Sequence, residues 1–102
     1  MPYVRKYYEV RANTGTPFWD ETPEVKSWLD DFEKKLVDDG IILEFKREIS
    51  EDYLTLTRIA KVDSLNNIDL IPMLSPVEDY RQKRMQYNYE NNIVWWSEDE
   101  NV

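Results

Sequence analysis

The chain has 102 residues, which is enough for one domain with a single modest core. It contains no histidine and no cysteine, which excludes thiolate or imidazole catalysis and the usual zinc sites. Acidic residues outnumber basic residues 21 to 13, and the net charge of −8 disfavours binding to phosphate backbones or anionic membranes.

The first predicted element is a strand over residues 3–12, because two rows of side chains alternate there and aromatic and β-branched residues are frequent. One row contains Val4, Lys6, Tyr8, Val10 and Ala12, and the other contains Tyr3, Arg5, Tyr7, Glu9 and Arg11. A turn-like stretch follows at residues 13–17.

A helix is predicted next. Thr22 and Pro23 suit the N-cap and the first helical position, and Gly40 suits the helix end. Apolar side chains recur at helical spacing at Val25, Trp28, Leu29, Phe32 and Leu36. We therefore expect Trp28 and Phe32 to be buried against a sheet.

Residues 41–49 and 53–62 alternate with a period of two and are separated by a polar turn, which predicts a β-hairpin. Residues 63–74 suit a loop with a helical turn. Ser75, Pro76 and Glu78 match a capping box and predict a second helix over about 76–91. Its apolar stripe is poor, so we expect it to pack through amphipathic side chains. A short strand over 93–96 ends the pattern.

This order of elements predicts an α+β fold of the ferredoxin-like βαββαβ type, with an antiparallel sheet and two helices on one face. Residues 1–96 are expected to form a single domain, and residues 97–102 an acidic C-terminal tail.

RNA-recognition domains resemble this topology, and Tyr3, Arg5 and Tyr7 would supply stacking groups on an open sheet. However, residues 53–62 contain no glycine, unlike the third strand of that family, and the net charge is unsuitable for binding RNA.

Dimeric α/β-barrel proteins, including small monooxygenases, are also similar in element order. Their sheets pack face to face, so this resemblance implies dimerisation. Their active sites often use histidine, which is absent here.

As a whole, this short, acidic and aromatic-rich chain resembles the small proteins of large tailed bacteriophages. The resemblance implies an assembly or accessory subunit located in the host cytoplasm or in the virion. The first residues lack the apolar run of a secretory signal, and no run of 18 apolar residues is present. We therefore expect a cytoplasmic protein without membrane contact.

Trp95 and Trp96 are adjacent in a predicted strand, so their side chains point to opposite faces and only one can enter the same core. We expect the other indole to meet a partner together with the acids that follow, and the exposed sheet to add a second contact. The predicted partner-binding residues are Tyr3, Arg5, Tyr7, Trp95, Trp96, Glu98, Asp99 and Glu100. A basic protein, or a second copy of the chain, fits such a surface.

The favoured hypothesis is a noncatalytic protein–protein interaction module without cofactor, metal site or catalytic residues. One alternative is an acidic inhibitor that imitates nucleic acid and occupies a basic groove on a host enzyme. Its face would consist of Asp30, Asp31, Asp38, Asp39, Glu44 and Glu48. Another alternative is a dimeric α/β barrel-type enzyme.

An oxygen-rich cluster follows the predicted hairpin at Asp63, Asn66, Asn67 and Asp69. It lacks the glycine and the closing glutamate of a calcium loop, so we interpret these residues as turn residues.

Overall fold

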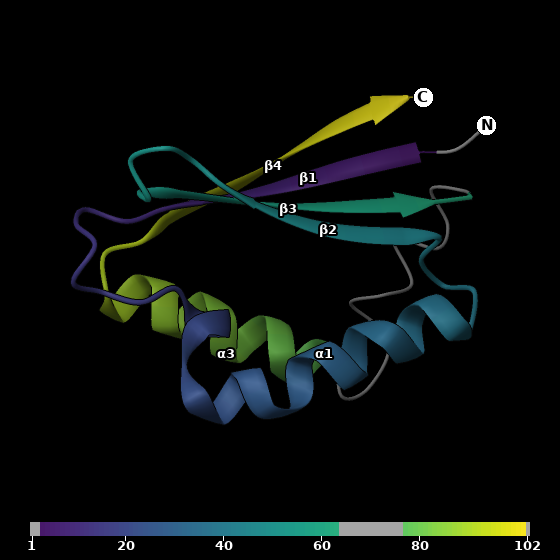
Figure 1. Ribbon diagram of the computed structural model, residues 1–102, viewed down its shortest axis with the longest axis horizontal. Coiled ribbons are helices and arrows are strands. Elements are labelled where there is room, and N and C mark those ends of the chain that lie inside the picture. Colours follow the sequence, from purple (N-terminus) through teal and green to yellow (C-terminus); the bar gives the residue numbers. More distant parts are fainter. Residues whose placement is uncertain (1–2, 64–76, 102) are drawn as a thin grey trace.

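The computed structural model describes residues 3–63 and 77–101, which form one sheet with helices on one side of it (Figure 1). In chain order the elements are β1 (Tyr3–Val10), the 3₁₀ helix η1 (Trp19–Glu21), α1 (Pro23–Asp38), β2 (Glu44–Ile49), β3 (Thr55–Val62), α3 (Val77–Glu90) and β4 (Val94–Asn101).

Neighbouring strands in the sheet are antiparallel, and their spatial order is β2-β3-β1-β4. The first strand in sequence is therefore an inner strand, and β4 returns to lie beside it. β2 and β3 form the expected hairpin. This order, with helices on one face, is the ferredoxin-like arrangement, so the predicted fold class is confirmed.

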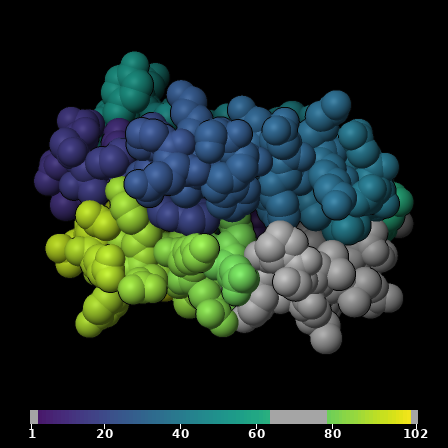
Figure 2. All heavy atoms as spheres, turned by 90° about the horizontal axis from the view of Figure 1, so that it is seen from below, coloured from purple at the N-terminus to yellow at the C-terminus, as the bar shows by residue number. Residues whose placement is uncertain are grey.

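The sheet has one face toward the helices and one open face (Figure 1). Odd-numbered residues of β1 point to the helices, because Glu9 contacts Arg84 and Asn88 of α3. The register extends this alternation to the neighbouring strands, where Leu56 and Trp95 lie opposite Glu9. Figure 2 shows the helix layer from below, with α1 and α3 lying side by side.

α1 begins at Pro23, and the chain leaves it at Gly40, whose φ of 75° is a conformation that glycine adopts without strain. Its buried side chains are Val25, Leu29 and Leu36. Both helix ends and the apolar spacing therefore agree with the sequence prediction.

Trp28 differs from the prediction, because 38% of its surface is exposed and Phe32 is only half-buried. The indole lies at the margin of α1, where it meets the edges of the Trp19, Phe32 and Tyr80 rings. The apolar stripe of α1 is thus wider than the sheet can cover, and its aromatic side packs against α3 instead.

The acidic end of the chain also differs from the prediction, because β4 continues through residues 97–101, where we expected a tail. Arg5 donates two hydrogen bonds to Asp99, at 2.7 and 3.1 Å, and Lys6 lies 3.3 Å from Glu100. These cross-strand ion pairs match the acids to the basic start of β1 and extend the strand pairing.

Other sequence predictions fall outside the described residues. These are the loop with a helical turn, apart from Asp63, and the Ser75 and Pro76 cap of the second helix. Within residues 3–63 and 77–101, no helix has the length and apolar character needed to cross a bilayer.

The ion pair between Arg5 and Asp99 predicts an effect of pH on stability. The Arg5 hydrogen bond lowers the pKa of Asp99, so the stabilisation is present at neutral pH and is lost as the pH falls through that lowered pKa. Asp99→Asn should reduce the free energy of unfolding by about 0.5 kcal/mol at pH 7, since the pair is partly exposed. Urea unfolding at a series of pH values should show this difference vanish in acid. Asp31→Asn, at an exposed site on α1, should leave the free energy of unfolding unchanged. A loss of stability in Asp99→Asn that does not depend on pH would contradict a stabilising ion pair between Arg5 and Asp99.

Candidate functional site

A cavity of about 540 Å³ lies between the helix-facing side of the sheet and the helices. Small-molecule sites usually have volumes of roughly 300–1,000 Å³. The lining comes from all four strands and from α1 and α3. Its exposed members include Arg81 and Met85 of α3, and Trp95 and Ser97 of β4. The cavity therefore opens between α3 and β4.

Aromatic rings form much of the cavity wall. On the helix side of the sheet and on the helices they are Tyr7 of β1, Phe32 of α1, Phe45 of β2, Tyr80 of α3 and Trp95 of β4. Tyr8 of β1 and Trp96 of β4 also belong to the lining. Phe32 and Tyr80 stack with 5.6 Å between their ring centroids. Such walls favour a flat, conjugated ligand, because rings pack best face to face with an offset or edge to face.

The charged groups of the wall are mainly positive. Among the described lining residues are four arginines and one carboxylate: Arg5, Arg58, Arg81, Arg84 and Glu33. This excess contrasts with the net charge of −8 of the whole chain. Arg5 is paired with Asp99, and Arg58 and Arg84 with Glu9. Over residues 3–63 and 77–101, no ion pair or hydrogen bond engages the Arg81 guanidinium.

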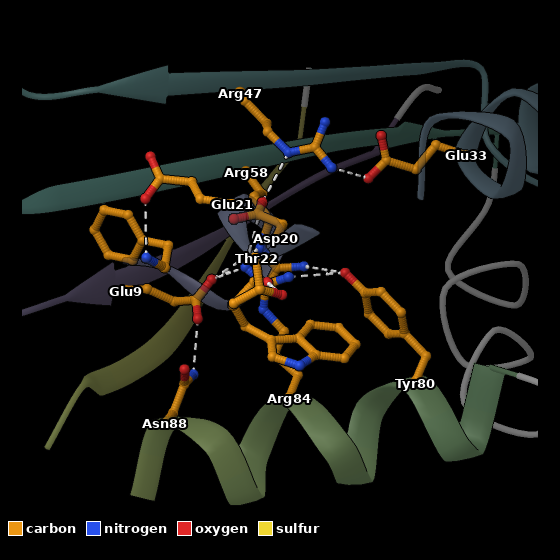
Figure 3. A network of polar contacts seen from close by, with 12 residues as sticks. Glu9, Asp20, Glu21, Thr22, Glu33, Arg47, Arg58, Tyr80, Arg84 and Asn88 are labelled. Carbon is orange, nitrogen blue, oxygen red and sulfur yellow. Dashed lines mark hydrogen bonds and ion pairs between the residues drawn. The ribbon is translucent and has the colours of Figure 1, made fainter. Parts of the chain in front are cut away.

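Glu9 is fully buried and forms the centre of a polar network (Figure 3). Arg84 donates to its Oε1, and Asn88 Nδ2 donates to its Oε2 at 2.7 Å. Arg58 Nε lies 3.3 Å from Oε1 as an ion pair without hydrogen-bond alignment. Arg84 is also 3.6 Å from Asp20. Arg84, Asn88 and Arg58 thus replace the water that the buried Glu9 carboxylate has lost.

The same two arginines hold Tyr80 (Figure 3). Arg84 Nη1 donates to the phenolic oxygen at 2.9 Å, and Arg58 Nη1 donates to it at 3.4 Å. A phenolic oxygen accepts two hydrogen bonds and donates one. Because both acceptor positions are occupied by arginines, the hydroxyl hydrogen points away from the two guanidinium groups. Tyr80 also lines the cavity.

The pKa shifts differ between Arg84 and Glu33. Burial opposes the charge of Arg84, but Tyr80, Glu9 and Asp20 together outweigh it and raise the pKa of this guanidinium. Burial raises the pKa of Glu33, and the opposing influence of its contact with Arg47 is smaller. Arg47 also donates to Asp20 at 2.9 Å, which joins the two groups of ion pairs.

Local periodicity explains how these groups meet. Tyr80, Arg84 and Asn88 are four residues apart, so they share one face of α3. Glu9 follows Tyr7 on the helix-facing row of β1, and Arg58 lies opposite Tyr7 in the register. The sequence analysis missed this network. The available signals were the spacing of four along the second helix and an acid within a row that also contains tyrosines.

The predicted partner-binding residues of β1 lie on the helix side of the sheet, so their expected place on the open face is wrong. Tyr3 packs against the core group of Leu36, Ile42 and Val62. Arg5 and Tyr7 line the cavity. The alternation of the two rows was correct, but the helices cover the row that contains Glu9. A partner-binding role for these residues stays a prediction.

The C-terminal candidates are divided between the two faces. Trp95 and Asp99 are on the helix side, and Trp96, Glu98 and Glu100 are on the open face. Trp96 stacks on Tyr8 with 5.1 Å between ring centroids. The expectation that one indole completes the core is wrong, because Trp95 and Trp96 are 41% and 43% exposed. β4 is an edge strand, so neither of its faces is fully covered.

The acids of the proposed nucleic-acid mimic do not form one surface. Asp30, Asp31, Asp38 and Asp39 are exposed on and just after α1. Glu44 and Glu48 belong to β2 and point to the open face, because Phe45 and Arg47 face the helices. The sheet therefore separates the two groups, and Glu44 is in addition paired with Lys46 at 3.3 Å.

No group of three acidic side chains among the described residues is placed to hold a metal ion. Of the oxygen-rich cluster in the sequence, only Asp63 belongs to the described part of the chain.

Solved structures that share the whole fold include the following two neighbours. One, from Deinococcus radiodurans, is described as a candidate antibiotic biosynthesis monooxygenase; it has a TM-score of 0.62, 9% identity and coverage of 97% of this chain and 91% of its own. The other, from an uncultured marine organism, is described as a dimeric ferredoxin-like protein; it has a TM-score of 0.58, 9% identity and coverage of 99% of this chain and 94% of its own. No family profile and no curated protein matches the chain.

These neighbours correct the favoured functional hypothesis. The noncatalytic interaction module, with its suggested role in phage assembly, is wrong, because the fold is shared with proteins described as a candidate antibiotic biosynthesis monooxygenase and as a dimeric ferredoxin-like protein. The alternative of a dimeric α/β barrel-type enzyme agrees better with them. The resemblance to phage proteins stays a prediction.

The buried network predicts a large stability effect at Glu9. Glu9→Gln leaves Arg58 and Arg84 buried without their countercharge, so it should reduce the free energy of unfolding by about 3–5 kcal/mol. Urea unfolding at pH 7 measures this. Glu51→Gln, in an exposed turn, is the matched control and should be neutral. A loss below about 1 kcal/mol for Glu9→Gln would mean that Asp20 alone is enough to compensate the arginines.

Proposed function

We propose that this chain is a small-molecule enzyme of the dimeric α/β-barrel type, and that the cavity beneath the sheet is its substrate site. The observation that supports the proposal is the wall of this cavity, where seven aromatic residues and four arginines line about 540 Å³. Ordinary protein cores are close-packed and leave few voids larger than a water molecule. A space of this size with convergent polar groups is instead typical of a ligand site.

Tyr80 is the proposed proton donor of this site. The chain has no histidine or cysteine for proton transfer, and Tyr80 is a titratable residue that lines the cavity. Arg58 and Arg84 orient the phenolic oxygen. Their positive charges would also stabilise the phenolate that remains after a proton has been given to the substrate. The name of the Deinococcus neighbour supports oxygenation as the first reaction class to assay.

The open face of the sheet is the proposed dimer interface. It carries the stacked rings of Tyr8 and Trp96 together with the apolar side chains of Val4, Val10 and Ile59. Charged side chains of both signs surround them, including ion pairs from Lys6 to Glu100 and from Lys46 to Glu44. A two-fold axis would bring this surface against itself, and mixed charges allow such self-complementary contact. The description of one structural neighbour as dimeric supports this arrangement.

The catalytic proposal predicts a selective effect of removing the Tyr80 hydroxyl. Oxygen uptake with a panel of fused-ring phenols should identify a substrate, and Tyr80→Phe should lower kcat for it by about 10²-fold or more. The ring stays in place, so the fold should be retained. Tyr89→Phe removes an exposed hydroxyl from the same helix and should leave kcat unchanged. A Tyr80→Phe variant that is as active as the native protein would exclude the proton-donor role, and no uptake with any phenol would exclude oxygenation of this class.

The dimer proposal predicts concentration-dependent association through Tyr8. Sedimentation equilibrium should show a dimer, and Tyr8→Ser should raise its Kd by about 30-fold, as expected for an aromatic residue worth about 2 kcal/mol at an interface. Tyr53→Ser changes an exposed tyrosine in the turn before β3 and should leave the Kd unaltered. A monomer at all concentrations, or equal effects of the two substitutions, would rule out the open face as the interface.

A further inference from the structure

We infer that the cavity accepts a planar aromatic monocarboxylate, whose carboxylate is held at the α3–β4 opening by Arg81. This inference rests on the proposed function and adds the chemical class of the ligand and its orientation. The inference follows from three properties of the cavity wall. These are the flat shape set by the aromatic rings, the position of Arg81, which has no partner among the described residues, and the position of the Glu33 carboxylate.

The rings determine the body of the ligand. Tyr7 and Trp95 project from neighbouring strands on the sheet side, while Tyr80 and Phe32 project from the two helices. Tyr7 is itself covered by the Arg58 guanidinium, 5.0 Å from the ring centroid. A ligand between these layers therefore meets flat groups on both sides, which favours a planar conjugated body over a branched aliphatic one.

Arg81 determines the charge of the ligand. It is exposed, lines the cavity and lies one turn before Met85 on α3, next to the opening. Arg5, the other arginine near this opening, already donates from Nε and Nη2 to the carboxylate of Asp99. Within the described ranges, Arg81 has no such partner. A guanidinium presents paired donors that match a carboxylate in two parallel hydrogen bonds.

Glu33 determines the orientation. It lines the same cavity from α1, beside Phe32, and its carboxylate is directed to Arg47 of β2. Arg81 and Glu33 therefore place a positive group on the α3 side and a negative group on the α1 side of one cavity. An anionic ligand group is attracted to the α3–β4 opening and repelled from the Glu33 side. A ligand with a second carboxylate at its far end is disfavoured.

Three naphthalene probes test these features with the native, full-length protein. They are 2-naphthoate, its neutral isostere 2-naphthamide, and 2,6-naphthalenedicarboxylate, each titrated by calorimetry at pH 7 and low salt. We expect 2-naphthoate to bind at least about tenfold more tightly than either of the others. Higher salt should reduce this preference over 2-naphthamide, because the opening is exposed to solvent.

Two variants of α3 identify the residue responsible. Arg81→Gln should reduce the affinity for 2-naphthoate to that for 2-naphthamide and leave 2-naphthamide binding unchanged. Lys83→Gln removes an exposed charge that does not line the cavity, and it should preserve the native preference. Because both sites are exposed, both variants should keep the native unfolding midpoint.

The outcomes separate the inference from the proposed function. Equal binding of 2-naphthoate and 2-naphthamide to the native protein, or an unchanged preference in Arg81→Gln, would overturn the carboxylate inference and leave an aromatic substrate site. Tight binding of the dicarboxylate would overturn the orientation set by Glu33. No binding of any probe would overturn the inference together with the aromatic substrate site on which it rests.

Discussion

The buried carboxylate of Glu9 is the interaction on which the rest of this structure depends. α3 presents a polar stripe to the sheet, and Arg84 and Asn88 in that stripe both donate to Glu9. Burying these charges is costly, and the cost is offset only while each keeps its partners. Charged groups also need fixed hydrogen-bond geometry, so they cannot interdigitate freely as aliphatic side chains do. This constraint explains how a helix with few apolar residues docks under the sheet and why a cavity persists beside it.

The network is at once structural and chemical. Arg58 and Arg84, which pair with Glu9, also donate hydrogen bonds to the phenolic oxygen of Tyr80. Asp20 in η1 and Arg47 in β2 extend the same chain of ion pairs to Glu33 in α1. Tyr80, which accepts from both arginines, is the proton donor that we propose for a protein without histidine and cysteine. The rigidity of the fold and the chemistry of the proposed site therefore have one origin.

The two faces of the sheet divide the remaining roles. On the helix side, aromatic and charged side chains surround the cavity. On the open side, the Tyr8 and Trp96 stack lies among apolar residues and charges of both signs. Because successive side chains of a strand alternate between faces, β1 and β4 each contribute to both surfaces. Substrate binding and dimerisation are thus proposed on opposite sides of the same strands.

Local sequence patterns alone determined the order of the helices and strands, the hairpin, the start of α1 at Pro23, the turn at Gly40 after its end, and the two alternating rows of β1. These features depend on backbone preferences and on the periods of helices and strands, which a single chain segment reveals. Only the tertiary structure decided which row of β1 the helices cover. An alternating pattern separates two rows of side chains, but it does not show which row faces the helix layer. The tertiary structure also brought Arg84 to Glu9 across 75 positions, paired Arg5 with Asp99 in an extended β4, and separated the acids of α1 from those of β2. Each of these outcomes depends on long-range contacts between segments whose local patterns are compatible with either face.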